Sequence, residues 1–291
     1  MKQKANDEPH RHPKDELLRE ARMPHIWCPG CGIGSAVSAA ITTLKKMGTD
    51  YDRLAIVSGI GCTGRVAGYL NLDSFHTTHG RAIPFATGLK LAKPELEVFV
   101  FSGDGDLFSI GGNHFMHAAR RNIDITVFCV NNMNYGMTGG QVSANTPTGA
   151  ITTTTPNGNT EIPLNLPSVA AACGAVYVAR WLSVDVRRLS QSFHEALLKP
   201  GFSFVEVIAP CPTAFGRRNR LGSALEMTKL YNKNSVIRNG VHPDETVIEE
   251  GKKIVLGKFV DIQRPTFMEG LSMVSQLRGT MWPKKEVAGN S

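Results

Sequence analysis

The stretch Val98-Phe99-Val100-Phe101-Ser102-Gly103-Asp104-Gly105-Asp106 decides the fold expected for this chain. Its apolar beginning is typical of a buried strand, and a helical pattern covers residues 107–121 after the glycines. A glycine-rich turn between a strand and a helix directs main-chain N–H groups and the positive end of the helix dipole at one place. We therefore expect this turn to bind an anion.

A second polar pair follows the next strand pattern, at residues 125–130. There the chain reads Asn131-Asn132, so both polar signals fall where a candidate parallel strand ends, which is the ligand-binding edge of an open α/β sheet. Asp104 would repel a phosphate, so a hard cation such as Mg2+ must lie between them and take oxygens from Asp104, Asn132 and a diphosphate. A lone Gly-Asp-Gly also fits a tight turn with a capping aspartate. The pair together resembles the fingerprint of thiamine diphosphate (TPP) proteins.

Alternating strand and helix patterns predict βαβ units, and hence an α/β fold with a doubly wound, mostly parallel sheet. Helices are expected at residues 32–47, 81–93 and 186–198, with strands at 54–58 and 202–208 among others. We expect three parts: an N-terminal mobile arm at 1–24, a TPP-binding domain with iron-sulfur loops at 25–209, and an extended C-terminal arm at 210–291 that contacts another subunit. The segment 146–167, rich in Thr, Pro, Gly and Asn, is interpreted as a lid over the site.

Composition narrows the class of protein. The chain has 291 residues, 42% of them apolar, and no run approaches the roughly 18 apolar residues of a membrane span. Its N-terminus is polar and does not resemble a signal sequence, so we expect a soluble, cytoplasmic protein with no membrane contact. The net charge of +7 favours acidic partners or substrates, but no Lys/Arg run is long enough to argue for nucleic acid. The length falls short of a single-chain TPP enzyme with two facing domains, which indicates a partner.

The cysteines fall into two groups. Cys129 and Cys173 lie in apolar segments and are interpreted as core residues. The others lie in Pro/Gly-rich loops where their side chains could turn toward a shared centre: Cys28, Cys31, Cys62 and Cys211. A thioredoxin-like pair would need a preceding strand, while zinc stays open on spacing alone. Four thiolates beside a carbanion-forming cofactor make sense as an exit for electrons, and zinc has no redox role.

Taken together, these motifs resemble the β subunit of the 2-oxoacid:ferredoxin oxidoreductases over about residues 24–220. The motifs are Trp27-Cys28-Pro29-Gly30-Cys31-Gly32, Gly59-Ile60-Gly61-Cys62, His76-Thr77-Thr78-His79-Gly80-Arg81, Gly103-Asp104-Gly105-Asp106, Asn132 with Tyr135-Gly136-Met137-Thr138, and Pro210-Cys211-Pro212. The resemblance implies a 4Fe-4S cluster on Cys28, Cys31, Cys62 and Cys211, and TPP with Mg2+ held by Asp104, Asn132 and the carbonyl of Asn134. The cofactor contacts expected are Ile60, Gly61, Cys62, Thr63, His79, Gly103, Asp104, Gly105, Asp106, Asn132, Asn134, Tyr135, Gly136, Met137 and Thr138.

The resemblance also implies what this chain lacks. A glutamate that activates the aminopyrimidine ring of TPP would come from an α subunit, in an αβ or α2β2 assembly, with coenzyme A as co-substrate and ferredoxin as electron acceptor. His79 could donate to the diphosphate. Arg65 is the best candidate here for binding a substrate carboxylate, and a structural arginine is an equal alternative.

The residues 137–141 look like the 2-oxoglutarate-using branch, which favours 2-oxoglutarate as substrate and succinyl-CoA and CO2 as products of a reversible reaction. Pyruvate or a branched-chain 2-oxoacid is the alternative substrate. A non-redox TPP-dependent decarboxylase subunit is the alternative activity.

Overall fold

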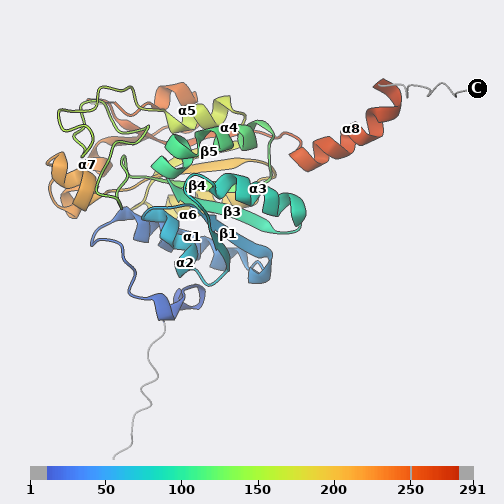
Figure 1. Ribbon diagram of the computed structural model, residues 1–291, viewed down its shortest axis with the longest axis horizontal. Helices are drawn as coiled ribbons and strands as arrows, with labels where there is room; N and C mark the ends of the chain where they lie inside the picture. The colour runs from blue at the N-terminus through green and yellow to red at the C-terminus, as the bar shows by residue number, and fades with distance from the viewer. Residues whose placement is uncertain (1–11, 250, 282–291) are drawn as a thin grey trace, which may run out of the picture.

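The computed structural model describes residues 12–249 and 251–281. Within them, eight strands form one sheet in the order β2-β1-β3-β4-β6-β5-β8-β7 (Figure 1). The strands are β1 Leu54–Ser58, β2 Asp73–His76, β3 Glu97–Gly103, β4 Thr126–Asn131, β5 Tyr177–Leu182, β6 Ser203–Ile208, β7 Ser235–Ile237 and β8 Ile254–Asp261. Neighbouring strands from β2 to β5 pair in parallel, and only β8 runs antiparallel to its neighbour β5. The predicted doubly wound, mostly parallel sheet is confirmed.

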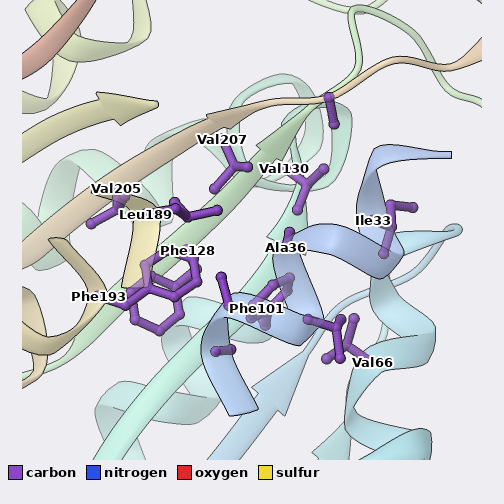
Figure 2. Packing of buried hydrophobic residues seen from close by; sticks show 14 of the residues in the cluster. Ile33, Ala36, Val66, Phe101, Phe128, Val130, Leu189, Phe193, Val205 and Val207 are labelled. Carbon is purple, nitrogen blue, oxygen red and sulfur yellow. The ribbon is translucent and has the colours of Figure 1, made fainter. Parts of the chain in front are cut away.

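Helices cover both faces of this sheet. The helices are α1 Gly32–Met47, α2 Val66–Tyr69, α3 Ala82–Ala92, α4 Gly112–Arg120, α5 Leu166–Ala172, α6 Val186–Leu197, α7 Ala224–Lys233 and α8 Phe267–Met281. Apolar residues of α1 and α6 pack on one face, and those of α3, α4 and α5 pack on the other. Figure 2 shows Phe193 of α6 against Phe128 of β4, with ring centroids 3.9 Å apart, beside Phe101 of β3. Because both faces are covered, the central strands are mostly apolar, and their carboxyl ends form the edge available for a ligand.

The helix expected at residues 107–121 is wrong in its first half. A π-helical turn covers Gly105–Ile110, and α4 begins only at Gly112. The main-chain N–H of Gly111 donates to the carbonyl of Asp106 at 3.0 Å, five residues back. The wide turn therefore begins directly after Asp104 and holds the Gly-Asp-Gly segment at the end of β3.

The N-terminal arm was predicted to be mobile, and for residues 12–24 this is wrong. Leu17 is fully buried, and the guanidinium of Arg19 donates to the carbonyls of Leu70 at 2.9 Å and Leu72 at 3.0 Å. These contacts tie the segment to the loop between α2 and β2. Residues 1–11 of the predicted arm lie outside the described residues.

The C-terminal arm predicted from residue 210 is also wrong in part, because this segment contributes β7 and β8 to the sheet. β8 pairs with β5 and so covers an edge that would otherwise expose unpaired main-chain groups. A domain boundary at residue 209 would therefore divide one sheet, since β6 precedes it and β7 and β8 follow it. Among the described helices and strands, α8 extends away from the body (Figure 1). Its contact with another subunit stays a prediction.

Among the residues that the structure describes, no helix is long and apolar enough to cross a membrane.

Candidate active site

The predicted cofactor contacts converge at the carboxyl edge of the sheet. β3 and β4 are neighbours with Gly103 opposite Val130, so the residues that follow the two strands lie side by side. One cleft there is lined by Ile60, Gly61, Cys62, Thr63, His79, Gly103, Asp104, Gly105, Asp106, Asn132, Asn134, Tyr135, Gly136, Met137 and Thr138. The structure thus brings together every residue predicted to contact the cofactor, and what each residue binds stays a prediction.

Three oxygen positions meet at the buried end of this cleft. The side-chain oxygen position of Asn132 lies 2.7 Å from the main-chain oxygen of Asn134 and 3.2 Å from Oδ1 of Asp104. Oxygens this close repel each other, unless the Asn132 amide turns over and donates to both or a cation lies among them. Burial raises the pKa of Asp104 to about 6, partly offset by a hydrogen bond from Ser143. A carboxylate, an amide oxygen and a carbonyl are ligands that Mg2+ accepts, so the residues fit a hard cation.

Asp106 joins the loops that form the cleft. Its carboxylate accepts hydrogen bonds from the hydroxyl of Ser102 at 2.8 Å and from the main-chain N–H groups of Gly80 at 2.8 Å and Ile60 at 3.2 Å. Nδ1 of His79 lies 2.6 Å from the same carboxylate. Both oxygens of Asp106 are therefore taken up by protein groups. Its place beside the cleft serves to hold His79 and the loop at Ile60 in position.

The cysteine group lies directly beside the cleft, across Gly136. A Cβ on Gly136 would lie 3.6 Å from Sγ of Cys211, 3.8 Å from Sγ of Cys62 and 3.6 Å from the side chain of Asn132. Burial, followed by the neighbouring thiols, raises the pKa of Cys31 to about 12 and that of Cys62 to about 11. Binding of a metal by these cysteines would therefore require the thiols to lose their protons.

Loop contacts bring these cysteines together. The indole Nε1 of Trp27 donates to the carbonyl of Cys62 at 2.8 Å, and the N–H of Gly32 donates to the carbonyl of Pro210 at 3.1 Å. Within the described residues, no three side chains of His, Cys, Asp or Glu meet in a geometry that would hold a single metal ion. The contacts of Trp27 and Gly32 hold the loops that carry the cysteines side by side, and what the thiols bind stays a prediction.

Arg65 is not among the residues that line the cleft. Its main-chain N–H donates to the carbonyl of Cys62 at 3.3 Å, and its Nε is buried with no hydrogen-bond partner among the described residues. Its predicted role, binding a substrate carboxylate, stays a prediction.

Sequence reasoning missed a buried polar layer behind the cleft. Ser143 donates to Asp104 at 2.9 Å, and Arg180 pairs with Glu206 at 2.6 Å with both side chains at most 1% exposed. A signal was available, because Arg180 and Glu206 are opposite charges within two otherwise apolar strand patterns and face each other in register.

Comparison with known proteins agrees with this geometry. Residues 59–207 match the family model described as the C-terminal TPP binding domain of thiamine pyrophosphate enzymes. The chain is 48% identical to the 2-oxoglutarate synthase subunit KorB of Methanothermobacter thermautotrophicus, covering 92% of this chain and 94% of that protein. It is 47% identical to the subunit of the same name from Methanocaldococcus jannaschii, covering 89% and 96%.

The chain belongs to the KorB family of 2-oxoglutarate synthase subunits. This confirms the predicted family and its enzyme class, TPP-dependent 2-oxoacid:ferredoxin oxidoreductase. A solved 2-oxoglutarate:ferredoxin oxidoreductase from Magnetococcus marinus, which has 2-oxoglutarate, coenzyme A and succinyl-CoA bound, superposes on this KorB-family chain with a TM-score of 0.81. The two are 29% identical, and the match covers 94% of this chain and 93% of that one.

Proposed function

We propose that this chain is the TPP-binding β subunit of an enzyme that converts 2-oxoglutarate, coenzyme A and oxidised ferredoxin to succinyl-CoA, CO2 and reduced ferredoxin. The observation that carries the proposal is the position of Gly136, because a Cβ there would lie within 4 Å of Cys62, Cys211 and Asn132 alike. A decarboxylase that transfers no electrons needs the cleft and has no use for the thiols. Electron transfer from a bound cofactor needs both, and needs them adjacent.

The cleft residues would hold the cofactor by its diphosphate. Asp104, Asn132 and the carbonyl of Asn134 would supply the oxygens for Mg2+, and main-chain N–H groups at the start of the turn Gly105–Ile110 would bind the diphosphate. When bound, TPP supplies an electron sink at the carbon that loses CO2. His79, whose Nδ1 lies 2.6 Å from the Asp106 carboxylate, would donate to the diphosphate.

The four thiols would hold a 4Fe-4S cluster. Cys31, Cys62 and Cys211 are partly buried on the side of the cleft, whereas Cys28 is exposed. A cluster held by these thiols would therefore have one ligand, Cys28, at the protein surface. Electrons can leave one at a time through it toward ferredoxin, and strongly reducing ferredoxin could drive the reaction toward CO2 fixation.

The cleft is half of an active site. No glutamate is among the cleft-lining residues of the described chain, so the group that activates the TPP ring must come from elsewhere. An α subunit supplies it, in an αβ or α2β2 assembly. The cytoplasmic location stays a prediction.

The deciding experiment compares substrates with the co-purified α subunit under anaerobic conditions. We expect 2-oxoglutarate to reduce a low-potential dye in a reaction that needs coenzyme A, and pyruvate to react at least about tenfold more slowly, since a site built for a second carboxylate loses a charge-assisted contact without it. Faster turnover of pyruvate would reassign the substrate. Release of CO2 without dye reduction, from protein that contains no iron, would replace the proposal with a non-redox decarboxylase.

A further inference from the structure

A continuous line of buried polar groups runs from the C-terminal part of the chain to Asp104. The guanidinium of Arg180 donates to the carbonyl of Thr246 at 2.5 Å and to Oε2 of Glu206 at 2.6 Å. Oε1 of Glu206 accepts from the amide of Asn131 at 2.6 Å. Asn131 in turn accepts from the amide of Asn145 at 2.5 Å. The carboxylate of Glu206 is thus satisfied on both oxygens in a place with no access to solvent.

This line determines which way each amide faces. A carboxylate only accepts hydrogen bonds, so Asn131 must present its NH2 group to Glu206 and its oxygen to Asn145. Asn145 must then present its NH2 group to Asn131 and its oxygen to Ser143, 3.0 Å away. The N–H of Met133 also donates to the Asn131 oxygen at 3.0 Å, which holds the same orientation.

Ser143 has one proton to give and lies near three oxygens, one of which is Oγ1 of Thr146 at 3.2 Å. Its hydroxyl lies 3.0 Å from the oxygen of Asn145 and 2.9 Å from Oδ2 of Asp104. An ionised carboxylate is the stronger acceptor, so the proton goes to Asp104. The main-chain N–H of Ser143 donates to the hydroxyl of Thr146 at 2.8 Å, which fixes the residue from its other side.

The two oxygens of Asp104 therefore have different tasks. Oδ2 is bound by Ser143, while Oδ1 faces the side-chain oxygen position of Asn132. We infer that Ser143 is a positioning residue for the cation: it holds Oδ2 so that Oδ1 joins the oxygens of Asn132 and Asn134. The buried pair of Arg180 and Glu206 fixes the orientation of the two amides that pack beside Ser143. This inference rests on the proposed function, since it presumes a cation in that site.

The test measures how TPP binding depends on Mg2+. The full complex is stripped of TPP and Mg2+, and TPP binding is followed by calorimetry over a range of Mg2+ concentrations. Loss of an outer partner of a metal ligand typically costs 10–100-fold in metal affinity. We expect Ser143→Ala to raise the Mg2+ concentration for half-saturation by about 10–100-fold, with TPP binding restored at saturating Mg2+.

The matched control is Ser109→Ala. The hydroxyl of Ser109 accepts the N–H of Ala144 at 2.9 Å, so this change removes an anchor of the same loop one residue away without a contact to Asp104. We expect its Mg2+ dependence to match the wild type. A general loosening of the loop would shift both variants alike and would overturn the inference.

A second variant changes Asn145, the next residue in the line of buried polar groups. Asn145→Ala removes a polar neighbour of Ser143 that also acts as a hydrogen-bond partner of Asp104, and we expect a smaller rise, about 3–10-fold, in the Mg2+ requirement. An unchanged Mg2+ dependence in Ser143→Ala, or in Asn145→Ala should the first variant fail to fold, refutes the positioning role. Failure of the wild-type complex to bind TPP with Mg2+ would instead refute the proposed function.

Discussion

The cation end of the cleft and the cysteine group lie on either side of Gly136, yet they are built differently. Asp104 and Asn132 directly follow two neighbouring strands, so the register of the sheet sets their separation. The cysteines come from loops far apart in the chain, and contacts between loops, such as that of Trp27 with Cys62, set their separation. The cation end of the cleft is held by the rigid core of the sheet. The cysteine group is held by the packing of its loops.

The cation end of the cleft is also more deeply buried than the outer part of the cysteine group. Asp104 is 1% exposed and is bound by protein hydrogen bonds, whereas Cys28 is exposed. We therefore expect the cleft to keep its shape without its cofactor, and the cysteine group to rely on whatever it binds. Each of the following variants should affect one of these regions more than the other.

The largest effect is expected at the cleft, from Asp104→Ala. Outer partners of metal ligands already contribute about 10–100-fold to metal affinity, so losing the carboxylate itself should weaken Mg2+-dependent TPP binding by more than about 100-fold. Activity should fall to background while iron content stays at the wild-type level. Calorimetry and an iron assay on the same preparation measure both. Asp73→Ala, at an exposed position on β2, is the control, and retained TPP binding in Asp104→Ala would contradict the assignment.

The converse is expected from Cys62→Ser. A hydroxyl is a poor replacement for a thiolate on iron, so iron content and anaerobic visible absorbance should drop sharply, and dye reduction should cease. TPP binding should stay within a few-fold of the wild type, because the cation ligands are untouched. Cys173→Ser, beyond the cysteine group, should keep its iron. Loss of TPP binding together with iron in Cys62→Ser would show that the two regions fold as one unit.

The comparison also explains which elements the sequence predicts. α1 at Gly32–Met47 and β1 at Leu54–Ser58 match their predicted bounds, because each has a strong apolar period and a glycine-rich boundary. β8 was missed because Gly257 and Lys258 interrupt its apolar run, and its pairing with β5 joins distant parts of the chain. β2 was missed because it is a short edge strand with mostly exposed residues.

The cleft residues could be found from local motifs, and the layer behind them could not. Asp104 and Asn132 each belong to a short motif whose position after a strand indicates its use. Ser143 stands in a polar loop that gives no such signal, and its contact with Asp104 appears only when that loop folds back over the end of β3. Short sequence motifs predict the residues that contact a ligand. Residues that only position those ligand contacts are brought together by tertiary packing, which the sequence does not show.

A smaller effect on both regions is expected from Gly136→Ala. The added methyl group would reach ordinary contact distance from Cys62, Cys211 and Asn132, so the chain should fold. It would occupy the space between the thiols and the cleft and crowd the groups bound there, and overpacking costs about 1–3 kcal/mol. We expect a chelator to remove iron about tenfold faster, with a lesser loss of TPP affinity. Gly34→Ala, where a methyl group meets no atom within 4 Å, is the control. Unchanged iron release would place the bound group away from Gly136.

The smallest effect is expected at the cysteine loop, from Ser223→Ala at the start of α7. Ser223 accepts from the N–H of Glu226 at 3.3 Å, and Glu226 accepts from the N–H of Ser223 at 2.6 Å, which is a capping box. Ala224, the next residue, lies where a side chain on Gly30 would be, so α7 abuts the cysteine loop. Loss of the cap typically costs about 1 kcal/mol, which lowers Tm by about 2–4 °C in a domain of this size.

Loss of the Ser223 cap tests whether α7 supports the neighbouring cysteine loop. Fraying of its first turn should loosen the loop at Gly30 and speed iron release, while TPP affinity stays unchanged because the cleft rests on the sheet. Ser235→Ala is the control, since its hydroxyl donates to the carbonyl of Asn232 at 3.0 Å at the other end of the helix. Equal rates of iron release in the two variants would mean that the first turn of α7 does not support the cysteine loop. The loops that carry Cys28, Cys31 and Cys62 would then hold the cysteine group without help from α7.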